Sequence, residues 1–201
     1  TYDAGDLTSV TNPLGQTFSM FTDQLGRVTG NSDPAGRNSR AKYDVLDRIV
    51  EVVDPLGQTS AATYDENGNL LTFQDARAVG SHGFTYDLRN RVHVYTDPLG
   101  ATETYTYDGL GNITSKIDRK GQTTSFEYDP LNRVRKVTYS DSSTVTLTWD
   151  DANRRVVIAD SVNGTITRLY DDLGRLARES SPEGQVDYQY DAASRRTHMT
   201  I

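Results

Sequence analysis

The dipeptide Tyr-Asp recurs along the whole chain at an almost constant interval, and this repeat limits the possible folds more than any other feature. Counted from residue 2, the successive intervals are 20, 21, 21, 22, 21, 21, 21, 21 and 20 residues. Trp149-Asp150 replaces one copy of the dipeptide and Thr22-Asp23 replaces another. Each unit of such an array packs mainly on its neighbours, so the pattern favours a function that depends on shape rather than on one unique site.

Each repeat contains two turn motifs, as residues 170–190 illustrate. Residues 171–174, Asp-Asp-Leu-Gly, form the first turn, because Asp bonds a backbone amide and Gly tolerates positive φ. Residues 181–184, Ser-Pro-Glu-Gly, form the second, and residues 175–180 and 185–190 are predicted strands. First turns recur at 23–26, 65–68, 108–111 and 129–132, and second turns at 12–15, 33–36, 54–57, 97–100 and 118–121.

Three departures from this pattern are predicted to be local variation. Asn stands where the first turn otherwise has Gly at Asn90, Asn132 and Asn153. Residues 75–83 lack the Pro-x-Gly form and carry a one-residue insertion, and residues 139–144 have Ser-Asp-Ser-Ser in place of a turn motif. Both segments are expected to be variable loops.

Composition excludes several classes of protein. The net charge of −7 argues against a nucleic-acid partner, which requires clustered Lys and Arg. The chain has no cysteine, so disulfides, thiolate metal sites and cysteine nucleophiles are absent. No apolar run approaches the length of a membrane-spanning helix, and no membrane insertion is expected. No motif indicates a cofactor.

The pattern predicts an all-β fold, in which tandem hairpins of about 21 residues form a long curved antiparallel strip. Residues 1–201 are expected to be one continuous array of about nine repeats, an internal piece of a longer polypeptide. The alternative is a β-propeller with two repeats per blade, which should make odd and even repeats differ. They do not differ visibly. A parallel solenoid is disfavoured by the hairpin-type turns.

The motif Tyr-Asp-x-x-Gly-Arg-Leu followed by Asp-Pro-x-Gly resembles the YD or Rhs repeat. It is complete at residues 170–176 and nearly so at 64–70, 107–113 and 128–134. That family includes bacterial Rhs polymorphic toxins, the B and C components of insecticidal toxin complexes, wall-associated proteins and teneurins. The resemblance implies a wall segment of a hollow shell, whose partners are the rest of the shell and an enclosed C-terminal toxin or effector.

The resemblance also implies a secreted or cell-surface protein, exported by a bacterium, although this sequence contains no targeting signal. No enzymatic activity is expected, and the self-cleaving core segment of the family's toxins is not in the chain. Self-association through open strand edges, near residues 1–10 and 190–201, is a further expectation. The alternative function is a cell-surface adhesin or carbohydrate-binding module. An enzyme such as a glycosidase would need a unique pair of acids, which the repeat does not supply.

The candidate functional residues are those of the repeat signature, and we expect them to be structural. Stacked tyrosines could form a sugar-binding platform and the aspartates a calcium site, but the regular period favours ladders of aromatic rings and turn caps. No catalytic, metal-binding or cofactor-binding residue is predicted. The signature comprises Tyr43, Asp44, Tyr64, Asp65, Tyr86, Asp87, Tyr107, Asp108, Tyr128, Asp129, Trp149, Asp150, Tyr170, Asp171, Gly174, Arg175, Tyr190 and Asp191.

Overall fold

The computed structural model describes residues 2–3, 6–77, 79–152 and 154–201, and these residues form strands and turns without a helix. The chain divides into two compact units, residues 1–102 and 103–201. The predicted all-β fold is confirmed. The described residues contain no helix that could cross a membrane.

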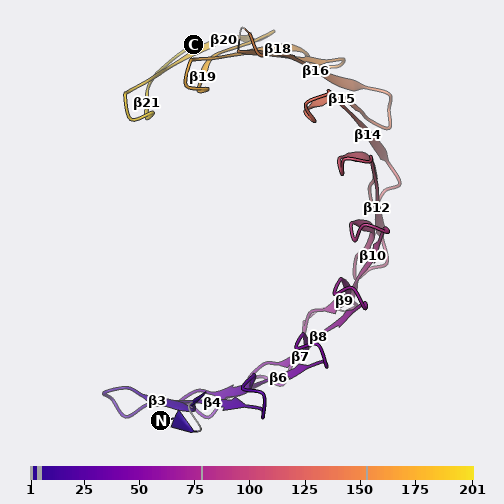
Figure 1. The fold of residues 1–201 in the computed structure, drawn as a ribbon. Helices are drawn as coiled ribbons and strands as arrows, with labels where there is room; N and C mark the ends of the chain where they lie inside the picture. The colour runs from indigo at the N-terminus through magenta and orange to yellow at the C-terminus, as the bar shows by residue number, and fades with distance from the viewer. Residues whose placement is uncertain (1, 4–5, 78, 153) are drawn as a thin grey trace. The chain divides into compact units, whose positions relative to one another are not determined.

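The first unit is an antiparallel sheet whose strands follow one another in chain order (Figure 1). A short two-stranded pair, β1 (Tyr2–Asp3) and β2 (Asp6–Leu7), precedes it. Its strands are β3 (Ser9–Thr11), β4 (Thr17–Thr22), β5 (Val28–Ser32), β6 (Asn38–Tyr43), β7 (Ile49–Val53), β8 (Thr59–Tyr64), β9 (Leu70–Gln74), β10 (His82–Tyr86) and β11 (Val92–Thr96).

The second unit repeats this arrangement, with each strand hydrogen-bonded to the next. Its strands are β12 (Thr102–Tyr107), β13 (Ile113–Ile117), β14 (Thr123–Tyr128), β15 (Val134–Thr138), β16 (Thr144–Asp150), β17 (Arg155–Asp160), β18 (Gly164–Tyr170), β19 (Leu176–Ser181), β20 (Gly184–Tyr190) and β21 (Arg196–Thr200). A propeller would separate strands into four-stranded blades. Neither unit does so, and each is a run of consecutive hairpins.

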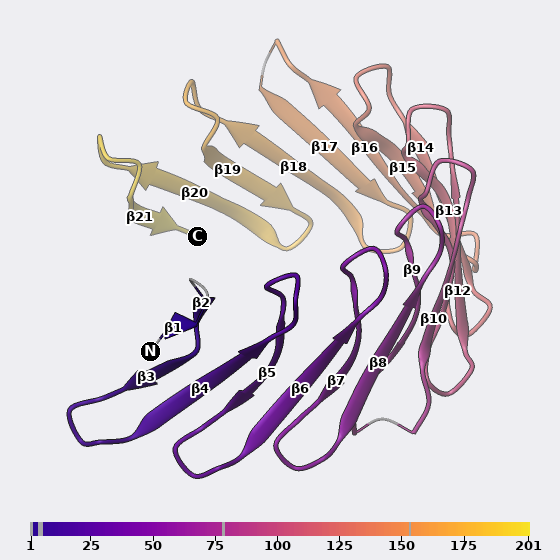
Figure 2. The same cartoon turned by 60° about the horizontal axis from the view of Figure 1, so that its bottom comes forward.

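The predicted turns close the hairpins. In each sheet the first turns lie in a row at one end of the strands and the second turns in a row at the other end (Figure 2). We call these two rows the first-turn edge and the second-turn edge. In a typical first turn, the amide of Gly26 donates to the carbonyl of Asp23 over 3.0 Å. Residues 139–144, predicted as a variable loop, contain the same turn: Ser142 has φ of 69° and donates to the carbonyl of Tyr139. A serine can therefore adopt the left-handed conformation that this turn requires.

The hairpin that contains Trp149 differs from the others. In the other first-turn hairpins between β4 and β21, the register shifts just before the position of the signature aromatic residue, as between Thr63 and Tyr64. Strands β16 and β17 pair without a shift, so Asp150 lies opposite Arg155 inside the ladder. The turn moves one residue along the chain and Arg154 has φ of 48°. The prediction for Asn153 lies outside the described residues.

The described part of the molecule has almost no closed core. Among the described residues, Val156 at 3% exposure and Asp97 at 9% are the most deeply buried side chains. The strands before each Tyr-Asp alternate as predicted: Thr63 and Thr106 are exposed, while Tyr64 and Tyr107 are half-buried. A single-layer sheet cannot bury both faces, so its stability must come largely from strand ladders and side-chain contacts between repeats.

The backbone conformation of Gly80 in the first unit allows the effect of one substitution to be predicted. Gly80 has φ of +140°, and a Cβ there would lie 2.4 Å from the carbonyl oxygen of Pro98. Gly80→Ala should therefore lower the free energy of unfolding by about 1–3 kcal/mol. Gly109→Ala is the control, because a Cβ at Gly109 meets nothing within 4 Å. Denaturant unfolding that shows equal effects for both would contradict this account of the backbone.

Candidate functional site

The carboxylate of each first turn organises the turn around itself, as Asp44 shows. Its Oδ1 accepts hydrogen bonds from the amides of Leu46 (2.9 Å) and Arg48 (3.0 Å). Its Oδ2 accepts a bond from Nε of Arg48 over 2.7 Å. One carboxylate thus holds the turn backbone and also fixes the direction of the arginine side chain.

The arginine then connects its own repeat to the next. Nη1 of Arg48 donates to the carbonyl of Asp65 over 2.9 Å, and its guanidinium lies 4.7 Å from the ring centroid of Tyr64. The Tyr64 hydroxyl donates in the opposite direction, to the carbonyl of Ile49 over 3.1 Å. We call this set of contacts, from a turn aspartate through an arginine to the next aromatic residue, the inter-repeat link.

The inter-repeat link recurs with little change of geometry. Arg27 lies 4.9 Å from the ring centroid of Tyr43, Arg133 lies 5.0 Å from Trp149, and Arg175 lies 4.7 Å from Tyr190. The tyrosine hydroxyls bond a backbone carbonyl of the preceding repeat. At Trp149 the indole Nε1 donates to the carbonyl of Val134 over 3.0 Å, so tryptophan reproduces the tyrosine contact.

Two repeats use asparagine in place of arginine and make a different contact. Nδ2 of Asn69 donates to its turn partner Asp65 and also to Oδ1 of Asn90 in the following turn, over 2.9 Å. Asn112 does the same with Asn132 over 3.2 Å. The shorter amide cannot reach as far as a guanidinium, and an asparagine in the next turn extends toward it instead.

These contacts explain several residues that replace glycine at positive φ. Asp47, Asn90, Asn132 and Ser194 have φ between 59° and 61°. Each offers an oxygen to the turn-closing side chain of the preceding repeat, which is Arg27, Asn69, Asn112 and Arg175 respectively. The left-handed conformation is unfavourable without glycine. A hydrogen bond across the repeat boundary offsets that cost.

Two of the first-turn aspartates, Asp87 and Asp65, are stabilised in their ionised form. Hydrogen bonds from the Arg91 side chain and backbone lower the pKa of Asp87 to about 2. Asp65, whose partner is an asparagine, also has a lowered pKa, mainly through the side-chain hydrogen bond of Asn69. The pKa of Tyr86 changes in the opposite direction: burial, with the negative charge of Asp65 second, raises it.

The structure arranges the signature residues as a series along the first-turn edge rather than gathering them into one site. Gly174 has φ of 74°, and the Arg175 Nε bonds Asp171 over 2.7 Å. Asp150 is the exception, because it lies in a strand opposite Arg155 instead of capping a turn. No group of three acidic or histidine side chains within the described ranges could hold a metal ion.

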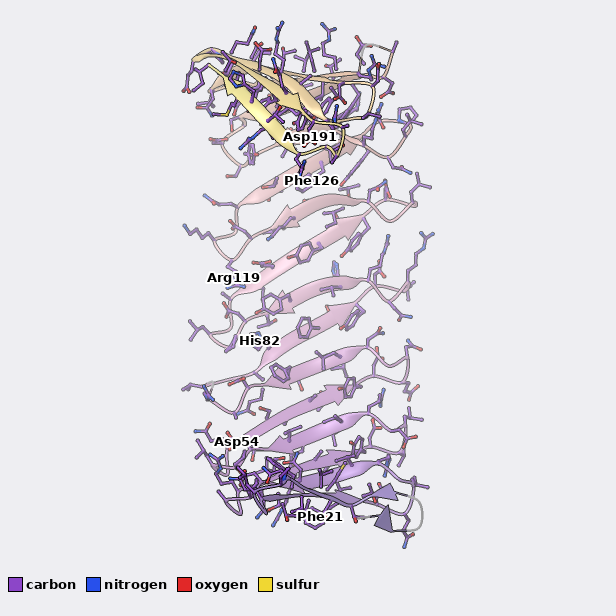
Figure 3. The ribbon with its side chains drawn as sticks, turned by 90° about the vertical axis from the view of Figure 1, so that its left-hand side faces the viewer. Phe21, Asp54, His82, Arg119, Phe126 and Asp191 are labelled. Carbon is purple, nitrogen blue, oxygen red and sulfur yellow. The ribbon has the colours of Figure 1, made fainter. Side chains whose placement is uncertain are left out.

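One cluster was missed by sequence reasoning. His82 stacks between Phe73 and Tyr95, with ring centroids 6.1 and 5.8 Å away, and its Nδ1 lies 2.8 Å from the Tyr95 hydroxyl. Phe84 contacts the same tyrosine, with ring centroids 5.3 Å apart. Figure 3 labels His82, along with Phe21 and Asp54 of the first unit and Arg119, Phe126 and Asp191 of the second. The irregular loop before His82 was the available signal, because it breaks the repeat.

Comparisons with known proteins agree with this repeated architecture. A family model described as RHS Repeat matches residues 43–79, 86–123, 107–144, 128–166 and 170–200. The fold resembles the crystal structures of TcdB2-TccC3-TEV, with a TM-score of 0.69, and TcdB2-TccC3, with 0.62, both at 14% identity. The Photorhabdus luminescens Tc holotoxin pore matches with 0.54, also at 14% identity.

These structures are much longer than the present chain. The matches cover 97%, 94% and 92% of this chain, but 12%, 13% and 13% of the respective solved chains. No curated protein matches the sequence.

The inter-repeat link predicts different roles for two arginines that close similar turns. Arg48→Lys should lower Tm by about 2–4 °C, because lysine loses both the forked hydrogen bonds and the stacking on Tyr64. Arg37 bonds Asp33 of its own turn and is 68% exposed. Arg37→Lys is the matched control and should leave Tm nearly unchanged. Equal shifts in thermal unfolding would show that contact with the next repeat contributes nothing.

The lowered pKa of Asp87 predicts how stability depends on pH. The folded state prefers the ionised carboxylate, so this stabilisation is complete above the unfolded pKa of about 4 and is lost as pH falls toward 2. Asp87→Asn keeps an oxygen acceptor but removes the charge. The slope of the unfolding midpoint against pH should become shallower between about 4 and 2. Glu183→Gln, on an exposed turn, is the control and should leave that slope unchanged.

Proposed function

Because the chain belongs to the RHS repeat family, we propose that it is a structural scaffold, a wall segment of a hollow shell that encloses a C-terminal toxin or effector. The observation that carries this proposal is the inter-repeat link. Where arginine closes the first turn, the link joins one repeat to the next by the same contacts, as at Arg48 and Tyr64 or at Arg175 and Tyr190. Such contacts hold neighbouring repeats of a sheet together. They give no single reactive side chain surroundings that differ from those of its equivalents in other repeats.

The chemistry of the link supports a structural role for the signature residues. A carboxylate that acts as a general acid or base works best with a pKa near the working pH, and the pKa of Asp87 is displaced the other way, to about 2. A guanidinium group covers one face of the ring at Tyr43, Tyr64 and Tyr190, which leaves less aromatic surface for a sugar to stack on. We therefore propose that the chain acts without catalysis and without binding sugar at these rings.

The proposal also concerns partners and location. The solved structures to which the fold is similar are eight or so times longer, as their 12% coverage indicates. We propose that residues 1–201 form one continuous part of such an array, secreted or at the cell surface, with the remaining shell and its enclosed domain as partners. Strand edges left open in a shortened array are then sites of self-association.

The proposal predicts the appearance of a longer polypeptide that contains these residues. Single-particle electron microscopy should show a hollow particle, with residues 1–201 in its β-sheet wall and density for a separate domain inside. A polypeptide with the C-terminal domain deleted is the control and should give the same wall around an empty interior. A particle without an internal cavity would contradict the proposed function.

A further inference from the structure

The hairpin of β4 and β5 departs from the repeat at two positions that lie opposite each other. Its aromatic residue stands one position early, as Phe21 before Thr22, and the residue paired with Phe21 across the strands is Gly30. The next repeat has Lys42 and Glu51 at these two positions, joined by an ion pair over 2.7 Å. Successive residues of a strand point to opposite faces, so Phe21 lies on the face away from the tyrosine positions.

Gly30 allows the Phe21 ring to lie close to the sheet. Gly30 is buried, and a Cβ there would lie 3.6 Å from the ring and 2.9 Å from the carbonyl oxygen of Ser39. Phe21 is nevertheless 54% exposed, so the ring presents apolar surface to solvent (Figure 3). Gly30 also pairs with Arg40 of β6, which places an aromatic ring and an arginine in one row across three strands.

An open hollow of about 500 Å³ lies along this row, and we call it the Phe21 hollow. Its lining contains no carboxylate and includes Phe21, Thr29, Asn38, Arg40 and Lys42. Lys42 is paired with Glu51, whereas Arg40 forms no ion pair or hydrogen bond with any residue that the structure describes. The hollow therefore combines an exposed ring with a guanidinium that has all its donors available.

The hollow beside Trp149 in the second unit shows the contrasting case. It also combines an aromatic residue with cations, but its lining includes carboxylates. Arg133 bonds Asp129 over 2.7 Å, and Arg135 bonds Glu127 over 2.6 Å. These guanidinium groups are paired within the chain, so that hollow offers an anion much less than the Phe21 hollow does.

We propose that the Phe21 hollow binds a sugar acid, a pyranose ring that carries a carboxylate. The carboxylate accepts two parallel hydrogen bonds from the Arg40 guanidinium, a geometry that suits both planar groups. The apolar C–H face of the sugar ring packs on Phe21. The sugar hydroxyls bond the polar side chains of Thr29 and Asn38, which a purely aromatic acid would leave unused.

The Phe21 hollow is separate from the inter-repeat link. Arg27 lies over the ring of Tyr43, and neither residue lines the hollow. The wall function therefore does not depend on this site, nor the site on the wall. A hollow longer polypeptide that ignores sugar acids would refute only the binding site, and a particle without a cavity that binds them would refute only the wall.

Titration of the isotope-labelled 201-residue chain with glucuronate, followed by NMR, tests the site. Glucuronate should bind with a dissociation constant on the order of 1 mM and shift the amide signals of Gly30 and Arg40. The indole signal of Trp149 should stay in place. Glucose, which has the same ring without the carboxylate, should bind roughly tenfold more weakly or worse.

Three variants assign the binding to the named side chains. Arg40→Gln should weaken glucuronate binding roughly tenfold or more, and Phe21→Leu roughly threefold. Arg37→Gln is the matched control, because it removes the same charge from a guanidinium that already bonds Asp33 and does not line the hollow. It should leave the dissociation constant unchanged. Circular dichroism of each variant verifies that the sheet is intact.

Three results would overturn the proposal. Glucuronate up to about 50 mM that leaves the Gly30 and Arg40 signals unmoved would show that the hollow is not a binding site. Benzoate that binds there as tightly as glucuronate would assign it to aromatic acids. Inorganic phosphate that binds equally well would reduce it to a plain anion site. These titrations use the unaltered chain, so their outcome holds even where a variant fails to fold.

Discussion

The contact of an arginine with its own turn aspartate and the next repeat's aromatic ring is the interaction on which the rest of the structure depends. A single-layer sheet has little interior, and here Val156 and Asp97 are the most deeply buried side chains among the described residues. Stability that a globular domain draws from a packed core must come from elsewhere. Arg48 shows the solution: its planar guanidinium lies over the ring of Tyr64 while its donors bind two repeats at once.

Much of the fold was predictable because turn chemistry is local. Asp at the start and Gly at the end of a four-residue segment mark where each strand stops, and alternation fixes which residues face each way. What could not be predicted depends on contacts between residues 14 to 23 positions apart. The pairing of Asn69 with Asn90 belongs to this class. Nothing in either local segment indicates that a neighbouring repeat supplies the partner.

The candidate site was also predicted only in part, because local turn chemistry can be read from the sequence and contacts between repeats cannot. The sequence identified the aspartates and aromatic residues by their period, but not that Arg48 lies over the ring of the next repeat. Nor did it reveal the stack of Phe73, His82 and Tyr95, which a loop insertion brings onto adjacent strands. Asp150 shares the dipeptide pattern, yet its turn begins one residue later, at Asp151, and Asp150 lies in a ladder opposite Arg155. Periodicity identifies a position, while its role depends on the register of the hairpin.

The arginine form and the asparagine form of the inter-repeat link differ in which repeats a gene can gain or lose. Arg27 and Arg48 both reach the carbonyl of the next turn aspartate, so deletion of residues 44–64 would bring Arg27 to Asp65 and preserve that contact. Deletion of residues 87–107 would instead place Asn69 before Gly111, which has no side-chain oxygen to accept its bond. An arginine repeat therefore keeps its backbone contact after such a deletion, although Arg27 would lose its bond to Asp47, whereas an asparagine repeat would lose its link to the next turn entirely.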